Sequence, residues 1–331
     1  MFVRRRSFVS ASRRVGWAAV ALSQAGLLAG CATAHSEPST DPSALHAPQA
    51  PTAPPPGLDV QPESPPVVIP SLPVVGEEEA RREASLLTLR MKASVSRFTT
   101  YSPAVRQRFL KLAHAAIAQS GTVIDRPQVL MVVDRNPAVQ ALCFVLALPN
   151  SDRWETLGGT PVSTGQSGRK FYYITPTGVF INTPDRLGYR AEGTKNENGI
   201  RGIGAKGMRV WDMGWQTAVK GWRPDHETGD IRLEIHATDP DFLERRLGHP
   251  ASEGCVRIPA TMNKFIDNNG LLDVLYEQAA SYDGRFRALL PKGRTPSPIA
   301  GDALVVVDSA EMPSIESART DRRDPSVKND G

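Results

Sequence analysis

Two apolar runs rich in β-branched residues, with a turn sequence between them, constrain the fold of this chain more than any other feature. The runs span residues 129–133 and 139–148, and residues 134–137, which include Asn136 and Pro137, separate them. Because β-branched side chains favour strands and Asn-Pro favours a turn, the two runs predict a β-hairpin. Five further strand-like segments follow, at residues 154–162, 171–174, 179–181, 208–211 and 231–235. The sequence therefore predicts a mainly β domain with short helices over residues 122–280.

Two amphipathic patterns precede this domain and predict a small helical segment over residues 77–121. Ser102 followed by Pro103 predicts the start of the second helix, and Gly121 predicts its end. In each pattern apolar residues recur at helical spacing. They are Ala84, Leu87, Met91, Val95 and Phe98 in the first, and Val105, Phe109, Leu112 and Ala116 in the second.

The later part of the chain shows weaker patterns. Residues 182–230 have the composition of a loop-rich insertion, residues 259–270 predict a short helix, and residues 271–276 predict a closing strand. From residue 281 to residue 331 the chain is polar and rich in Pro and Gly, apart from the apolar run at residues 303–307. We expect this C-terminal extension to be largely disordered.

The N-terminal residues have the composition of an export signal followed by a tether. Residues 1–30 combine a basic start with an apolar run, and the run ends at Cys31 after small residues. This ending resembles the bacterial lipobox, and the resemblance implies that Cys31 carries a lipid. Residues 32–76 contain twelve prolines, too many for a packed core, so residues 31–76 predict a disordered tether. An ordinary signal peptide with a chance cysteine is the alternative.

The distribution of charge argues against a nucleic-acid partner. The formal net charge is +4, but five arginines lie within the first 30 residues, where there is no acidic residue. Without those five, 34 basic residues remain against 35 acidic ones. A protein that binds nucleic acid is expected to keep a basic face, which this balance does not support.

The three cysteines, at positions 31, 143 and 255, stand far apart. No pair has the spacing of metal ligands, so we expect no metal site and no cofactor. Cys143 lies inside an apolar run and predicts a small buried hydrophobic residue. A disulfide between Cys143 and Cys255 would consume the second thiol, and separate roles for the two are favoured.

His236 and Cys255 form a candidate base and nucleophile. His236 ends an apolar strand-like run, and Cys255 follows a glycine nineteen positions later. The turn-rich residues between them could fold the two side chains together. A neighbouring imidazole can take the proton of a thiol and lower its pKa from about 8.5 toward neutrality. The pair therefore predicts acyl transfer through a cysteine thiolate.

The residues around this pair resemble the signature of the L,D-transpeptidase (YkuD-like) catalytic domain. The matching positions are His236, Gly248, Ser252, Gly254, Cys255 and Arg257, and residues 162–165 and 175–180 resemble two turns of the same family. The resemblance covers roughly residues 128–277. It implies a β-sandwich catalytic domain that acts on peptidoglycan stem peptides during cell-wall synthesis. With the lipid on Cys31, it implies a lipoprotein attached to a membrane on the periplasmic side of the envelope.

Carried over residue by residue, the resemblance assigns a role to each position of the motif. Cys255 matches the nucleophile, His236 the base, and the backbone carbonyl of Ala237 the group that orients the imidazole. Backbone N–H groups of Gly254 and Cys255 match an oxyanion hole, which needs donors aimed at the developing negative charge. The remaining motif residues are expected to support the substrate or the turn. They are Ser252, Arg257 and Glu253, the last of which replaces the histidine usual in the family.

The implied reaction has two steps. Cys255 attacks a tetrapeptide stem, releases D-alanine and keeps the acyl group as a thioester, which an amine acceptor then resolves. Two alternatives stay open. Water could resolve the thioester, which would make the protein an L,D-carboxypeptidase, or the domain could bind peptidoglycan without catalysis, which Glu253 favours and the intact His236 and Cys255 oppose.

Overall fold

The computed structural model describes residues 67–311. The expected export signal at residues 1–30, the expected lipidation at Cys31, most of the expected tether and residues 312–331 lie outside the described residues. In the described part, no helix combines the length and the apolar character that crossing a membrane requires.

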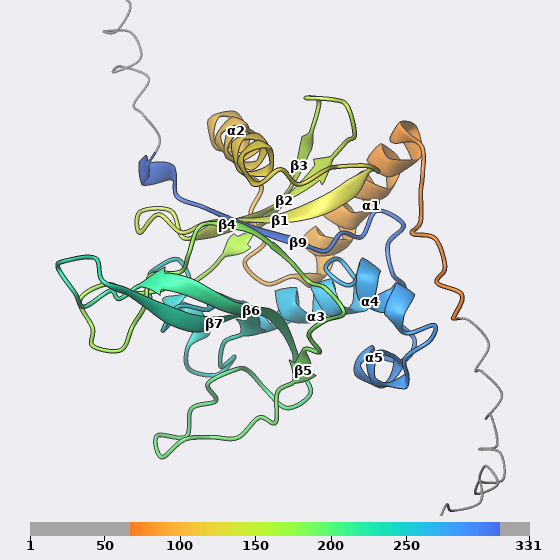
Figure 1. The fold of residues 1–331 in the computed structure, drawn as a ribbon. Coiled ribbons are helices and arrows are strands. Elements are labelled where there is room, and N and C mark those ends of the chain that lie inside the picture. The colour runs from red at the N-terminus through yellow and green to blue at the C-terminus, as the bar shows by residue number, and fades with distance from the viewer. Residues whose placement is uncertain (1–66, 312–331) are drawn as a thin grey trace, which may run out of the picture. The chain divides into compact units, whose positions relative to one another are not determined.

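The fold is a mixed arrangement of helices and two β-sheets that share one apolar core (Figure 1). The first sheet has five strands in the order β3-β2-β1-β9-β4. All neighbours in it are antiparallel except β1 and β9, which are parallel. The strands are β1 (Gln128–Asp134), β2 (Ala141–Ala147), β3 (Glu155–Pro161), β4 (Gly178–Ile181) and β9 (Ala303–Val307).

The second sheet has four strands in the order β5-β6-β7-β8. They are β5 (Tyr189–Arg190), β6 (Arg209–Val219), β7 (Thr228–Ala237) and β8 (Val256–Ile258). β6 and β7 form the long hairpin in the lower part of Figure 1. β7 and β8 are parallel, so the chain must cross from the end of one to the start of the other. Residues 238–255 make that crossing and include the short 3-10 helix η1 (Glu244–Arg246).

Helices flank the sheets on several sides. α2 packs against β9 and β4 of the first sheet, and α1 lies beside β3 and reaches α3. The predicted caps of α2 are present: the Ser102 hydroxyl accepts a hydrogen bond from the Val105 amide, and Gly121 adopts a left-handed conformation with φ +68°. The helices are α1 (Glu77–Ser94), α2 (Pro103–Ser120), α3 (Ala260–Asn269), α4 (Val274–Ala279), α5 (Gly284–Leu289) and the 3-10 helix η2 (Ser309–Glu311).

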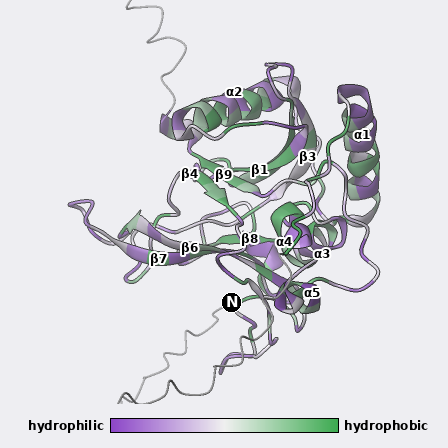
Figure 2. Ribbon diagram, turned by 45° about the vertical axis from the view of Figure 1, so that its right-hand side comes forward, coloured by the Kyte–Doolittle hydropathy of each residue, from purple (hydrophilic) through white to green (hydrophobic). Residues whose placement is uncertain are grey.

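The core lies between the two sheets and extends under the helices. Every residue of β1, β2 and β9 is buried, and Figure 2 shows apolar colour along β1 and β9, whereas α1 and α2 also carry polar residues. The predicted hairpin of β1 and β2 is confirmed, and Cys143 is fully buried within β2 as expected. A mainly β architecture with helices is therefore present, although α1 and α2 are 18 residues long rather than short.

Two expectations for the C-terminal part are wrong. Residues 271–276 do not form a strand: α4 begins at Val274, and Asp273 immediately before it forms a buried ion pair with Arg209. Nor do residues 281–311 form a disordered extension: α5 lies in this stretch, and β9 fills the position between β1 and β4. The domain therefore extends past residue 280, because the apolar run at residues 303–307 completes the first sheet.

A substitution in β9 tests whether the C-terminal strand is part of the core. Val305 is fully buried and lies opposite Val132 of β1 and Val179 of β4. Val305→Asp should lower the free energy of unfolding by about 3 kcal/mol, because it buries an unpaired carboxylate. Urea denaturation followed by circular dichroism measures the change.

The matched control is Val123→Asp, because Val123 is 78% exposed. This control should change the free energy of unfolding by no more than about 0.5 kcal/mol. Equal stability of the Val305→Asp variant and the control would contradict a structural role for β9.

Candidate active site

Pairing of β7 with β8 brings the predicted base and nucleophile onto neighbouring strands. In the parallel register Ile235 lies opposite Val256, and His236 lies opposite Arg257. Cys255 immediately precedes β8 and is therefore level with Glu234, two residues before His236 on β7. Two residues of separation on adjacent strands correspond to about 7–8 Å between Cα atoms, which long side chains can span.

The thiol of Cys255 lies against the backbone of β7. Its Sγ atom is 3.7 Å from the carbonyl oxygen of Arg232, and the Glu234 backbone N–H faces it as a donor. Burial is the main cause that raises the pKa of the thiol to about 11, and the Glu234 carboxylate raises it further. The Glu234 N–H and the Arg257 guanidinium act in the opposite direction. At neutral pH the sulfur is therefore protonated.

The imidazole of His236 is buried and oriented by the backbone. Its Nδ1 atom lies 2.8 Å from the carbonyl oxygen of Ala237, the contact that the family resemblance implies. This bond leaves Nε2 as the nitrogen available to exchange a proton. Burial lowers the pKa of His236 to about 4, and the positive charge of Arg257 contributes in the same direction. The imidazole is therefore neutral at physiological pH.

The resting pair thus consists of a neutral thiol and a neutral imidazole. No hydrogen bond joins His236 to Cys255 among the described residues. The expectation that the imidazole lowers the pKa of the thiol in the free protein does not agree with this geometry, in which the pKa is raised. A neutral imidazole can still accept a proton while the sulfur attacks, so the arrangement suits general-base chemistry better than a preformed thiolate.

The loop that carries the cysteine is held by the two upstream turns that resemble those of the family. The carbonyl of Thr164 accepts hydrogen bonds from the amides of Ala251 and Ser252, at 3.1 and 3.0 Å. The buried hydroxyl of Thr175 donates to the carbonyl of Gly254 at 2.7 Å and accepts from the Gly165 amide at 2.8 Å. These contacts fix the loop from both sides, so the position of Cys255 depends on segments far earlier in the chain.

Only glycine fits at position 165, in the first of the two turns that hold the cysteine loop. A Cβ atom there would lie 2.0 Å from the backbone carbonyl oxygen of Tyr173, which cannot move without breaking the turn. Gly254 has a different constraint, because its φ of +135° lies in a region that residues with side chains rarely adopt. A Cβ atom there would also lie 2.7 Å from Cδ1 of Ile231, so space and backbone conformation both favour glycine.

The two backbone donors expected at the oxyanion hole differ in availability. The Gly254 amide donates to the hydroxyl of Ser252 at 3.1 Å, and the same hydroxyl donates to the carbonyl of Cys255 at 2.6 Å. Ser252 therefore ties the turn together. The Cys255 amide has no acceptor among the described residues, so it is the donor that could meet a developing oxyanion.

Arg257 and Glu253, the two charged residues of the cysteine loop and β8, differ in burial and in hydrogen bonding. Arg257 is partly buried, its Nη1 donates to the carbonyl of Ala251 at 3.1 Å, and its Nε has no partner among the described residues. Its charge lowers the pKa of both Cys255 and His236. Glu253 is exposed and forms no ion pair with a described residue. No direct bond joins the two side chains among the described residues.

A polar cluster beside the sulfur was not predicted from the sequence. Glu234 accepts a hydrogen bond from the Tyr189 hydroxyl at 3.0 Å, and Arg232 forms an ion pair with the buried carboxylate of Asp212. The available signal was the alternation of β7, in which Arg232, Glu234 and His236 point to one face while Leu233 and Ile235 point to the core.

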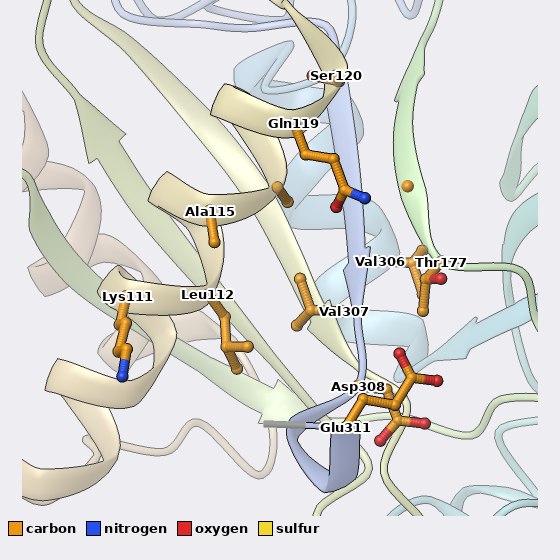
Figure 3. Close-up of a pocket in the computed structure, with 12 residues that line it drawn as sticks. Lys111, Leu112, Ala115, Gln119, Ser120, Thr177, Val306, Val307, Asp308 and Glu311 are labelled. Atoms are coloured by element: carbon orange, nitrogen blue, oxygen red, sulfur yellow. The ribbon is translucent and has the colours of Figure 1, made fainter. Parts of the chain in front are cut away.

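The pocket in Figure 3 lies away from this site. It is a groove of about 570 Å³ between α2 and the strands β4 and β9, and neither His236 nor Cys255 lines it. Gln119 projects from α2 toward the side of the groove where Thr177 lies, and Leu112 and Val307 line the groove between them.

No protein-family model matches the chain, and no curated protein sequence is significantly similar to it. The function is therefore inferred from the geometry of β7, β8 and the cysteine loop, together with the motif that they carry.

The pKa of His236 predicts how stability depends on pH. Because the folded protein holds the pKa near 4 and the unfolded chain has the ordinary value of 6.5, the unfolded state binds the proton first as the pH falls. Stability should therefore decrease between pH 6.5 and pH 4, by about 3 kcal/mol from this residue, and not further below pH 4.

His236→Gln removes this titration while keeping a polar side chain. Urea unfolding at several pH values should give a shallower pH dependence for this variant than for the wild-type protein. Parallel curves for the two proteins would show that the imidazole is not held neutral.

Proposed function

We propose that this chain is a cysteine acyltransferase and, more specifically, a peptidoglycan L,D-transpeptidase with a YkuD-like β-sandwich. The single observation that carries the proposal is the parallel pairing of β7 with β8, which sets His236 and Cys255 two residues apart on neighbouring strands. The amide of Cys255, which has no acceptor in residues 67–311, adds a donor next to the sulfur. Base, nucleophile and oxyanion donor are the three groups that thiol-based acyl transfer needs.

Acylation of the enzyme begins with the thiol. Sγ of Cys255 attacks the carbonyl carbon of the third residue of a tetrapeptide stem, and the thiol proton moves to Nε2 of His236. The negative charge that develops on the carbonyl oxygen is stabilised by the Cys255 amide. Collapse of the tetrahedral intermediate breaks the amide bond to D-alanine, whose nitrogen takes the proton from His236. A thioester on Cys255 remains.

Resolution of the thioester reverses these roles. An amine acceptor attacks the thioester carbonyl, the carbon–sulfur bond breaks, and a proton returns to the sulfur through His236. The product is a new amide bond, and the free thiol is restored. Water in place of the amine would give the hydrolytic product of an L,D-carboxypeptidase.

The electrostatics of the pair supports this order of events. A pKa of about 11 for Cys255 and of about 4 for His236 keep both groups uncharged in the resting protein. An uncharged thiol is weakly nucleophilic, so the proton must leave as the bond to carbon forms. Arg257 favours the thiolate through its charge, which lowers the energy of that step.

The location of the protein is also part of the proposal. The apolar run that ends at Cys31 supports export and lipidation, which would hold the domain at a membrane on the periplasmic side of the envelope. Peptidoglycan stems are then within reach, since the proline-rich residues after Cys31 could act as an extended spacer.

Mass spectrometry tests the function. Purified mature protein, incubated with a defined tetrapeptide muropeptide, should release D-alanine and carry the acyl group on Cys255. A carbapenem should likewise add its mass to that residue. An unmodified Cys255 in folded protein after both treatments would refute the proposal.

Two variants make the test specific. Cys255→Ser and His236→Ala should each lower the rate of D-alanine release by at least about a hundredfold, because one lacks the nucleophile and the other the base. Cys143→Ser is the matched control, because Cys143 is buried in β2, in the first sheet. Provided that it folds, this control should retain the adduct on Cys255.

A further inference from the structure

The polar cluster beside the sulfur contains a carboxylate with no cation bound to it. Glu234 precedes the residue pair that joins β7 to β8, and its backbone N–H faces the sulfur of Cys255. Its side chain is partly buried, and its one hydrogen bond to a described residue is the 3.0 Å contact from the Tyr189 hydroxyl to Oε1. No Lys, Arg or His among the described residues forms an ion pair with Glu234.

Arg232, whose charge acts on Glu234, is already paired with another carboxylate. Asp212 lies opposite Glu234 on β6 and is fully buried. Its carboxylate accepts a hydrogen bond from Nε of Arg232 at 2.8 Å and a second one from Nη2 of the same side chain. This two-point contact neutralises Asp212, so Arg232 is not free to bind Glu234. Glu234 therefore has no direct ion pair among the described residues, although the charge of Arg232 still lowers its pKa.

This charge hinders the first step of the proposed reaction. The Glu234 carboxylate raises the pKa of the Cys255 thiol, and burial raises the pKa of Glu234 itself. A residue that opposes thiolate formation cannot serve acylation. Glu234 suits the second step, resolution of the thioester. At that stage the sulfur is already bound to the acyl group, and a positively charged acceptor must approach it.

We infer that Glu234, oriented by the Tyr189 hydroxyl, binds the ammonium group of the acceptor amine and takes a proton from it. The inference rests on the proposed function and adds the acceptor subsite to it. An ammonium ion has no lone pair and cannot attack, so one N–H bond must break before the nitrogen–carbon bond forms. Glu234 accepts that first proton and becomes a neutral carboxylic acid.

The remaining steps need only the amine, the thioester and the two side chains, with water as the final proton acceptor. The neutral amine attacks the thioester carbonyl, and the carbon–sulfur bond breaks as the intermediate collapses. The second proton of the nitrogen passes through His236 to the sulfur of Cys255. Glu234 then loses its proton to water, and both side chains return to their starting states.

The experiment measures what fraction of the thioester on Cys255 reacts with the amine and what fraction is hydrolysed by water. Full-length protein is incubated with a tetrapeptide stem that carries a free side-chain ammonium, which serves as donor and acceptor. The ratio of cross-linked to hydrolysed product is read by mass spectrometry. This ratio does not depend on how fast the thioester forms, so an effect on acylation cannot imitate the result.

Glu234→Gln should lower that ratio about tenfold, the usual effect of losing a hydrogen bond to a charged group. Tyr189→Phe should lower it by a smaller factor, since the carboxylate remains but loses its orientation. Asp230→Asn is the matched control, because it removes an exposed carboxylate on β7, four residues before Glu234. It should change the ratio less than about twofold.

Hydroxylamine distinguishes an ammonium subsite from a merely structural role. It is an uncharged nucleophile at neutral pH, so its reaction with the thioester should be the same in Glu234→Gln and wild-type protein. If Glu234→Gln lowered the yield with hydroxylamine as much as the yield with the stem amine, the inference would be wrong. It would also be wrong if the variant did not lower the cross-linking by the stem amine. Either result would leave the proposed function standing. Absence of any thioester in the wild-type protein would overturn the proposed function and the inference with it.

Discussion

The short parallel pairing of β7 with β8 is the constraint on which the rest of the site depends. Only three residue pairs form it, yet both strands run in the same direction, so the residue before β8 comes level with the middle of β7. The sulfur of Cys255 therefore meets the backbone between Arg232 and Glu234 rather than the imidazole directly. Any residue at position 234 becomes a neighbour of the Cys255 sulfur by this register alone.

Hydrogen bonds from the two upstream turns hold the cysteine loop in place, which the three residues of β8 could not do alone. Thr164 and Thr175 bind the loop from turns that belong to the edges of the first sheet, and buried Gln140 binds Thr164 through both atoms of its amide, each contact at 2.7 Å. These polar contacts are buried and satisfied, so they specify one loop geometry. The two sheets are thereby joined at the site by hydrogen bonds in addition to apolar packing.

Local sequence patterns predicted those features that depend on residues close together in the chain. The hairpin of β1 and β2, the caps of α2 and the contact between His236 and Ala237 follow from propensities or from a motif of a few residues. Long-range pairing was not accessible in this way. The run at residues 303–307 looked isolated because its partners lie far away in the chain, and Asp273 looked like a strand residue because its buried ion partner Arg209 is distant in sequence. For the same reason the Tyr189–Glu234 contact could not be anticipated.

The place of β9 has a consequence for the order in which the molecule can assemble. β9 is the last strand in the described part of the chain, and it separates β1 from β4. Until its residues have been synthesised, β4 has no strand to pair with and the edge of β1 is open, so the first sheet cannot close. A chain that emerges from its N-terminus therefore cannot complete the first sheet until residues 303–307 are available.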